Sequence, residues 1–256
     1  MDATDTLTNS TMTRVNLEGI HSFCALSNAR QIPLLGLGVY LIKPGKATED
    51  AVLWALQAGY RHIDTAAIYR NEVSVGNAIR KSGIPRDQVF VTTKLFDKDQ
   101  GYESALAACE LSLEKLGLDY IDLYLIHSPR PGPERRTESW NALQKLVHPW
   151  LTRQDLVSFC QAQHIAVEAY SPLSRGHKLE DPMLDKIATK YSKSPAQILI
   201  RWSLQKGYIV LPKSANKERI EQNADVFDFD IADGDMNLLD SFNEDYVSGW
   251  DPTVAP

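Results

Sequence analysis

The chain has 256 residues, of which 43% are hydrophobic and 23% are charged, and its formal net charge is −6 at pH 7. These values are typical of a water-soluble globular protein, and a chain of this length can bury one large core. The negative charge argues against a surface for nucleic acid or for an anionic membrane. No apolar run approaches the ~20 residues that a membrane span needs, so we expect no membrane partner.

The N-terminal residues give no sign of a targeting segment. Residues 1–13 are polar and include acidic side chains, without the apolar core of a signal peptide or the basic character of a transit peptide. Cys24, Cys109 and Cys160 form no CxxC pair and are expected to be free thiols, as in a reducing compartment. We therefore expect residues 1–13 to be a disordered tail, residues 14–256 to form a single domain, and the protein to be cytoplasmic.

Short β-rich runs alternate with longer amphipathic stretches along the chain. A hairpin is predicted first, over residues 21–27 and 31–34. Six further strands are predicted at residues 35–40, 61–65, 89–94, 121–127, 165–171 and 209–214. The predicted helices cover residues 48–58, 72–82, 102–116, 134–147, 152–162, 182–191 and 195–206. Apolar runs separated by helices of this length indicate βαβ units and a parallel sheet.

Two parallel architectures fit this alternation, an open doubly wound sheet and a (β/α)8 TIM barrel. A doubly wound dinucleotide-binding sheet would carry a GxGxxG turn after its first strand, and this sequence has none there. Polar residues instead stand at the C-terminal ends of successive predicted strands, namely Asp64, Lys94 and His127. Because a TIM barrel keeps its active site at that end of its strands, the sequence favours the barrel.

The alternation of strands and helices is interrupted once. Residues 134–147 and 152–162 both have helical patterns, His148, Pro149 and Trp150 separate them, and no strand is predicted between the two. Consecutive helices also occur as additions to complete barrels. The interruption by itself therefore leaves open whether a part of the barrel is missing.

Four residues have the chemistry that reduction of a carbonyl group requires. Tyrosine is a weak acid, with an ordinary pKa of about 10, but a neighbouring lysine ammonium favours the phenolate. Tyr69 and Lys94 supply this pair, Asp64 supplies a carboxylate that keeps the lysine charged, and His127 supplies an imidazole that can donate to a carbonyl oxygen. Taken singly, each has an ordinary structural explanation as well, such as a helix cap for Asp64.

Longer segments around these residues resemble the signatures of the aldo-keto reductase family. Residues 59–66 read GYRHIDTA and are followed by Tyr69 and by Asn71 and Glu72, as in the first signature. The second signature is similar to residues 116–127, LGLDYIDLYLIH, and the third to residues 211–219, LPKSANKER. Residues 91–94, VTTK, match the lysine strand of the family. The similarity spans roughly residues 20–251, in the family's order.

The resemblance implies that the chain reduces an aldehyde or ketone to an alcohol with NADPH, by direct hydride transfer and without a metal. By position, Tyr69 matches the general acid and Lys94 the residue that lowers its pKa. Asp64 matches the partner of that lysine, and His127 the residue that orients the carbonyl. The implied partner is a small-molecule carbonyl substrate, and we expect a monomer.

The resemblance also implies where the cofactor and the substrate bind. Lys213, Ser214 and Arg219 correspond to the grip on the 2′-phosphate of NADP, and Gln222 and Asn223 to the adenine contacts. Tyr170 corresponds to the aromatic residue that stacks on the nicotinamide ring, and Ser171 and Leu173 correspond to contacts of the pyrophosphate loop. Three further residues correspond to the lining of the substrate pocket: Tyr40, Phe96 and Trp250. Ser128 stands where several relatives have a bulky aromatic residue, which indicates a roomier pocket.

The sequence departs from the family pattern where the alternation breaks. The family has two strands and one helix between the positions of residues 147 and 148, ending in a Ser-Asn pair and a Gln that hold the nicotinamide carboxamide. Roughly 35 residues, about the length of one βαβ unit, are missing by this comparison, so we expect an incomplete barrel of about six strands. The alternative to an active reductase is a truncated, catalytically impaired isoform or pseudoenzyme that at most binds nucleotide. A scaffold role has only an analogy of fold behind it.

Overall fold

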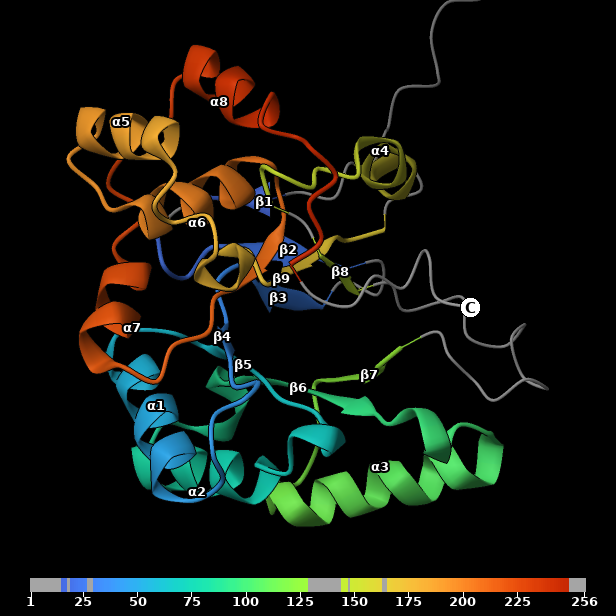
Figure 1. Cartoon of the computed structure of the whole chain (residues 1–256). Helices are drawn as coiled ribbons and strands as arrows, with labels where there is room; N and C mark the ends of the chain where they lie inside the picture. The colour runs from blue at the N-terminus through green and yellow to red at the C-terminus, as the bar shows by residue number, and fades with distance from the viewer. Residues whose placement is uncertain are drawn as a thin grey trace, which may run out of the picture.

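The structure is a computed structural model that describes residues 15–17, 19–26, 30–128, 144–146, 148–162 and 165–248. Parallel strands lie at its centre and helices lie around them (Figure 1). The predicted tail over residues 1–13 and the predicted pocket residue Trp250 lie outside the described residues.

A small antiparallel sheet precedes the parallel strands. It consists of β1 (Val15–Asn16), β2 (Phe23–Ala25) and β3 (Gln31–Pro33). The pairing of β2 with β3 confirms the predicted hairpin, whereas β1 was not predicted. Cys24 and Ile32 face each other across this pairing and are both 1% exposed, which joins the sheet to the main core.

Seven parallel strands, joined in two ladders, form the wall of the barrel. In order along the chain they are β4 (Leu37–Gly38), β5 (His62–Asp64), β6 (Phe90–Leu95), β7 (Leu123–Ile126), β8 (Gln144–Leu146), β9 (Glu168–Tyr170) and β10 (Ile209–Leu211). One ladder runs β4-β5-β6-β7 and the other β10-β9-β8, and every pairing within them is parallel. Parallel strands that alternate with helices are the βαβ pattern of a barrel wall, which confirms the predicted TIM-barrel class.

The two ladders meet between β4 and β10. Leu35 forms a parallel bridge with Val210, whose backbone nitrogen donates to the Leu34 oxygen at 2.6 Å and whose oxygen accepts from Gly36 N at 2.9 Å. A β-carbon on Gly36 would lie 2.7 Å from Leu211 Cδ2 and 2.8 Å from His62 Nδ1, so only glycine fits where these strands meet. The wall therefore runs β7-β6-β5-β4-β10-β9-β8.

The number of barrel strands differs from the prediction, since seven are present and about six were expected. The additional strand is β8, which lies in residues predicted to be helical, and it pairs with β9 from Gln144 opposite Glu168 to Leu146 opposite Tyr170. This pairing satisfies backbone groups at an edge of β9 that would otherwise lack a partner, and such tertiary context overrides a local helical preference. Among the described residues no ladder joins β7 to β8, so these strands are the two ends of an incomplete barrel wall.

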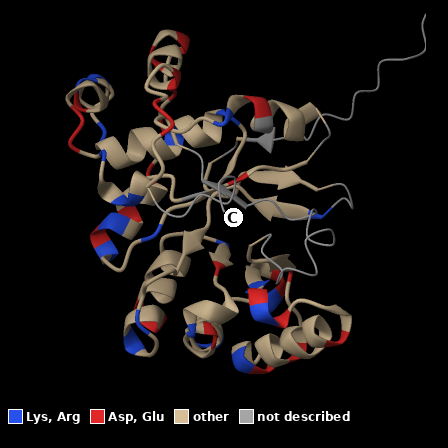
Figure 2. Ribbon diagram, turned by 45° about the vertical axis from the view of Figure 1, so that its right-hand side comes forward, with Lys and Arg blue, Asp and Glu red and all other residues tan. Residues whose placement is uncertain are grey.

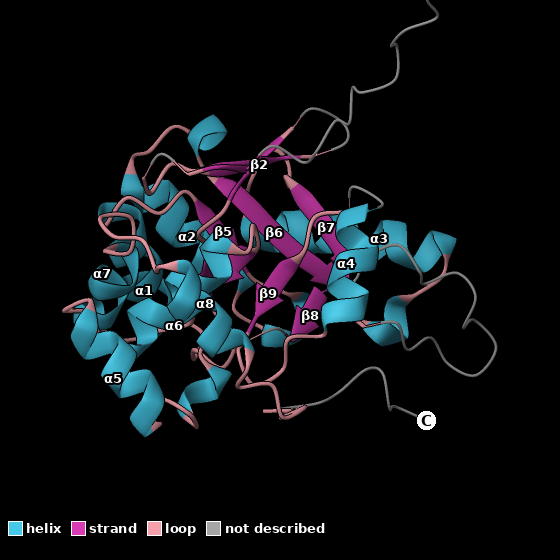
Figure 3. Ribbon diagram, turned by 90° about the horizontal axis from the view of Figure 1, so that it is seen from above, coloured by secondary structure: helices cyan, strands magenta, loops and turns pink. Residues whose placement is uncertain are grey.

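Eight α-helices are described, and they surround the strands. They are α1 (Lys46–Gln57), α2 (Glu72–Ser82), α3 (Tyr102–Leu116), α4 (Gln154–Ala162), α5 (Pro182–Lys190), α6 (Pro195–Gln205), α7 (Lys217–Ala224) and α8 (Asp233–Asp240). Figure 3 shows the strands in the middle, with α3 and α4 on one side and the other helices opposite them. Charged residues are concentrated on the helices and their connections, while the central strands carry few (Figure 2).

Packing becomes looser toward the β7 end of the wall. All three residues of β5 are buried, whereas all four residues of β7 are half-buried. Helix α6 buries eight of its residues, from Gln197 to Leu204, while α3 buries only Ser112 and Leu116. None of the described helices combines the length and the apolar character that crossing a membrane would require.

Candidate active site

A buried ion pair lies at the C-terminal ends of β5 and β6. Lys94 Nζ donates to Asp64 Oδ2 at 2.5 Å and to the backbone oxygen of Thr65 at 2.8 Å. The side chains of Lys94 and Asp64 are 1% and 7% exposed. A charged lysine is tolerated at such a depth because a carboxylate and a carbonyl oxygen replace its water. The ammonium is thereby held in one place.

Tyr69 and His127 gather around this ammonium. Tyr69 lies in the short 3-10 helix η1 (Ala67–Tyr69) that follows β5, and Lys94 Nζ is 5.2 Å from its ring centroid. His127 comes directly after β7, and its ring centroid is 5.5 Å from that of Tyr69, with the ring planes at 84°. The structure thus brings together all four residues that the sequence placed at three successive strand ends.

The imidazole of His127 is held in its neutral form. Burial, assisted by the charge of Lys94, lowers the pKa of His127 to about 4. Its Nδ1 is buried and has no hydrogen-bond partner among the described residues. A neutral imidazole has one N–H to donate, so at neutral pH His127 can serve as a hydrogen-bond donor without carrying charge.

Asn71 connects two loops of the site, a role that the sequence did not reveal. The Thr65 hydroxyl donates to Asn71 Oδ1 at 2.8 Å, and Asn71 Nδ2 donates to the backbone oxygens of Val39 at 3.0 Å and Ile42 at 3.3 Å. Asn71 is fully buried. It therefore ties the loop after β5 to the loop after β4, which carries Tyr40. Its presence in the first signature was the only signal.

Two of the predicted pocket residues, Tyr40 and Phe96, lie at the same end of the strands. Tyr40 is 45% exposed, and its ring centroid is 5.0 Å from that of Tyr69. Phe96 directly follows β6 and is half-buried. Behind His127, Gln100 Nε2 donates to the backbone oxygen of Ser128 at 3.1 Å, a contact for which the sequence gave no signal because Gln100 lies in an irregular loop.

The loops after β9 and β10 carry the predicted phosphate contacts. Ser171 and Leu173 follow β9 in a tight turn, in which Ser171 has φ of 53° and accepts from Ser174 N at 2.9 Å. Lys213 and Ser214 follow β10. Because β9 and β10 are parallel neighbours, both loops lie at the same edge of the wall. Tyr170, the predicted stacking residue, is the last residue of β9.

Helix α7 begins in the loop after β10 and adds further predicted contacts. Its N-cap residue Asn216 accepts from Arg219 N at 2.9 Å, and the Ser214 hydroxyl accepts from Asn216 N at 3.1 Å. Lys213 and Arg219 are exposed, and neither forms an ion pair with another described residue. Two uncommitted cations beside a hydroxyl suit a dianion such as a 2′-phosphate. Farther along α7, Gln222 is exposed and Asn223 is 5% exposed.

Comparison with protein families shows to which family the chain belongs. The model of the aldo/keto reductase family matches residues 42–149 and 139–244. This chain is an aldo-keto reductase. The family consists of oxidoreductases that act on small carbonyl compounds and use NADP(H).

Individual aldo-keto reductases are similar over most of their length. The 9,11-endoperoxide prostaglandin H2 reductase of Trypanosoma cruzi is 43% identical, with 89% of this chain and 93% of that protein covered. The glyoxal reductase of Bacillus subtilis is 40% identical, with 89% and 95% covered. Among solved structures, the aldo-keto reductase of Bombyx mori in complex with NADP is similar at a TM-score of 0.79 and 34% identity, with 88% and 94% covered.

The same comparisons bear on the missing part of the barrel. The alignment with the Trypanosoma cruzi reductase extends over 266 residues, whereas 89% of this 256-residue chain is about 228 residues, so about 38 positions lie opposite a gap in this chain. The family model matches in two pieces that overlap at residues 139–149. The break in the match therefore falls around the junction that the sequence indicated, and it agrees with the incomplete wall between β7 and β8.

Proposed function

We propose that this aldo-keto reductase binds NADPH and reduces an aldehyde or ketone to an alcohol, with Tyr69 as the general acid. The observation that carries the proposal is the position of Lys94, whose ammonium is fixed by Asp64 and lies 5.2 Å from the Tyr69 ring centroid. A cation at this distance favours the phenolate that remains once a tyrosine has given up its proton. A fixed cation beside a tyrosine is what such a weak acid needs in order to give up its proton.

Each of the four residues then has one task. When bound, NADPH supplies the hydride that the carbonyl carbon accepts. His127 donates a hydrogen bond to the carbonyl oxygen and sets its direction, and Tyr69 transfers its phenolic proton to that oxygen as the alcohol forms. Lys94 stabilises the phenolate left behind, and Asp64 keeps Lys94 charged and in place.

The chain offers more residues to the 2′-phosphate and adenine end of the dinucleotide than to its nicotinamide end. Lys213, Ser214 and Arg219 would hold the 2′-phosphate, and Gln222 and Asn223 the adenine. Ser171 and Leu173 would contact the pyrophosphate and Tyr170 the nicotinamide ring. At the nicotinamide end, the Ser-Asn pair and the Gln of the family pattern have no counterpart in this sequence, so fewer groups hold the reacting ring than the 2′-phosphate.

The substrate would enter past Tyr40 and Phe96, and the family resemblance assigns Trp250, which lies outside the described residues, to the same pocket. One relative is named for its action on glyoxal, a small dicarbonyl compound, and we propose an aldehyde of this kind as a first substrate. We further propose a cytoplasmic monomer, since Cys24 and Cys109 are free thiols, as a reducing compartment favours.

Turnover of NADPH with glyoxal tests the proposal. The purified chain is compared with Tyr69→Phe, which removes the phenolic hydroxyl and keeps the ring. Loss of a general acid lowers the rate roughly 100-fold to 10,000-fold, so we expect cofactor absorbance to fall at least about 100-fold more slowly in the variant. Equal rates in the two proteins would remove Tyr69 from the mechanism.

A second candidate function is nucleotide binding without catalysis, in a truncated isoform or pseudoenzyme. The observation that favours it is the wall of the barrel, in which no described ladder joins β7 to β8. A displacement of about 1 Å between reacting groups can cost ~100-fold in rate, and the tetrad and the phosphate loops lie on different ladders. Saturable NADPH binding with no turnover in the unmodified chain would favour this function over the first.

A further inference from the structure

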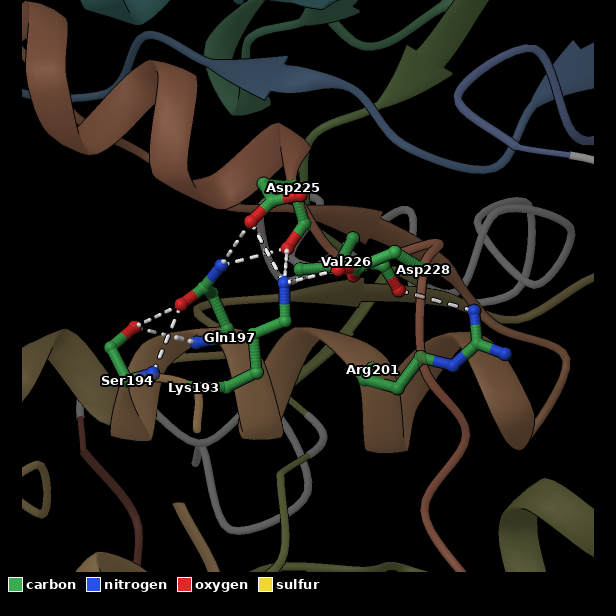
Figure 4. A network of polar contacts seen from close by, with 7 residues as sticks. All are labelled: Lys193, Ser194, Gln197, Arg201, Asp225, Val226 and Asp228. Carbon is green, nitrogen blue, oxygen red and sulfur yellow. Dashed lines mark hydrogen bonds and ion pairs between the residues drawn. The ribbon is translucent and has the colours of Figure 1, made fainter. Parts of the chain in front are cut away.

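Polar side chains of α6 and of the residues just before it bind the segment that follows α7. Gln197, Arg201 and Gln205 are spaced four residues apart along one side of α6, and Lys193 lies just before the helix, which begins at Pro195. Each contacts a residue between positions 225 and 231, and Figure 4 shows the first three of these side chains with their partners. We call the four residues the α6 ladder.

The first half of the α6 ladder holds Asp225. Lys193 Nζ lies 2.8 Å from Asp225 Oδ2 and 2.8 Å from Asp228 Oδ2. Gln197 Nε2 donates to the Asp225 backbone oxygen at 2.7 Å. Gln197 is itself fixed because its Oε1 accepts from Ser194 N at 2.9 Å in the capping box of α6. Asp225 is thus held by its side chain and by its main chain.

The second half of the α6 ladder continues along the same segment. Arg201 Nη1 donates to the Val226 oxygen at 3.1 Å, and Arg201 pairs with Asp230. Gln205 exchanges two hydrogen bonds with the backbone of Ile231, at 2.8 and 3.0 Å. Val226 and Ile231 are buried, so the segment is anchored in the core between its polar contacts.

Asp225 is also the C-cap residue of α7. Its backbone nitrogen donates to the Gln222 oxygen at 3.1 Å. Helix α7 has eight residues, too few to be stable alone because isolated helices shorter than ~12 residues are marginal. Its middle is held by the hydroxyl of Tyr60, which donates to the Ile220 oxygen at 3.2 Å. Its C-terminal end depends on Asp225 and hence on α6.

We propose that Lys193 and Gln197 are positioning residues for the 2′-phosphate and adenine end of NADPH. They fix Asp225 and, through it, the helix that presents Arg219, Gln222 and Asn223. The inference rests on the proposed function, since it takes α7 as the helix that contacts the cofactor.

Charge compensation is a second part of the same role. Lys193 faces two carboxylates, Asp225 and Asp228, and Arg201 faces that of Asp230. The side chains of Lys193 and Arg201 are 10% and 6% exposed, so both cations are held against these carboxylates rather than in solvent. Without Lys193, two uncompensated negative charges would stand beside the helix that receives a dianionic phosphate, and they would disfavour it.

Lys193→Met tests the inference against Lys206→Met as the matched control. Lys206 is the C-cap residue of α6 and pairs with Asp240 of α8 at 2.5 Å, away from α7. Two quantities are measured in the full chain: hydrogen exchange of the α7 amides without cofactor, and the Kd for NADPH from fluorescence titration. Changes that act through an intervening element alter binding by roughly twofold to thirtyfold. We expect Lys193→Met to speed hydrogen exchange of the α7 amides and to raise the Kd for NADPH by that factor. Lys206→Met should change neither quantity, and Lys193→Arg should retain most of the affinity for NADPH.

Each result decides between the inference and the proposed function. Faster α7 exchange with unchanged NADPH affinity would overturn the inference and leave the proposed function standing. Equal weakening by Lys193→Met and Lys206→Met would also overturn it, because the effect would then be a general loss of stability. If the unmodified chain bound no NADPH at any concentration, the proposed function would fail first and the inference with it.

Discussion

The side chain of Lys94 is 1% exposed. The cost of removing its ammonium from water is offset by the carboxylate of Asp64 and the backbone oxygen of Thr65. Removing one partner of a buried ion pair leaves an unpaired charge, which costs about 3–5 kcal/mol. The pair of Lys94 with Asp64 therefore contributes little net stability but makes the site intolerant of change. The same compactness places the ammonium close enough to Tyr69 to act on it.

Two fully buried histidines predict how stability depends on pH. Burial lowers the pKa of His62 to about 3 and that of His148 to about 4, whereas in the unfolded chain a histidine has a pKa of about 6.5. The unfolded state therefore binds more protons below pH ~6.5, and stability that is complete above that pH is lost as the pH falls toward 4. Burial lowers the pKa of the partly buried His127 to about 4 as well, and with three such groups the slope reaches about 4.1 kcal/mol per pH unit.

Urea unfolding at about pH 7.5, 6.5 and 5.5 measures this slope. His148→Gln should flatten the dependence by about a third, because one of the three groups no longer titrates. A midpoint that stays constant over this range would show that these imidazoles are not held neutral in the folded chain.

At the scale of residues, the sequence predicted the site residues that belong to long motifs. Asp64, Tyr69, Lys94 and His127 stand at strand ends within recognisable signatures, and the structure gathers them. The bridging role of Asn71 could not be predicted, because it depends on which loop faces it across the end of β4. The same holds for Gln100, whose partner Ser128 is set by how the loops fold over β7.

Helices α2 and α3 approach each other so closely that one position admits only glycine. A β-carbon on Gly76 would lie 1.7 Å from the backbone oxygen of Leu116, which cannot move without moving α3. Gly76→Ala should therefore destabilise the chain by about 1–3 kcal/mol, as overpacking does. Unfolding in urea gives the change in free energy.

Gly234→Ala in α8 is the matched control for this prediction. No atom lies within 4 Å of where its β-carbon would stand, so alanine should stabilise the chain by about 0.4–1 kcal/mol by restricting the unfolded state. Shifts of the same sign in the two variants would contradict the argument from close packing.

At the scale of elements, periodicity located the helices better than it located the strands next to the break. The bounds of α2 and α3 are those predicted, because both have clear periodic patterns that end at a glycine. The helix predicted over residues 134–147 was wrong at its end, where β8 forms. A strand of three residues gains its hydrogen bonds from β9, and no local pattern encodes that partner. Helices α7 and α8 were not predicted.

The incomplete wall has a consequence for the whole molecule, since apolar side chains are exposed on the helices next to its two ends. Leu106 of α3, which connects β6 to β7, is 49% exposed, and Phe159 of α4, which follows β8, is 58% exposed. Strand β7 is half-buried throughout. In a complete barrel, further strands and a helix would lie between β7 and β8. This chain lacks about one βαβ unit there, so less of the chain is present to cover these side chains.

Exposed apolar surface of this kind promotes association of unrelated molecules and binding of hydrophobic dyes. The double variant Leu106→Glu, Phe159→Glu should therefore bind less of such a dye and remain soluble at higher concentration than the unmodified chain. Its unfolding midpoint should change little, because substitutions at exposed positions usually alter stability by less than about 0.5 kcal/mol. Val73→Glu is the control, since Val73 is 52% exposed but lies on α2, away from both ends of the wall. If Val73→Glu reduced dye binding as much as the double variant, the exposed surface would be an ordinary property of the outer helices rather than a result of the incomplete barrel.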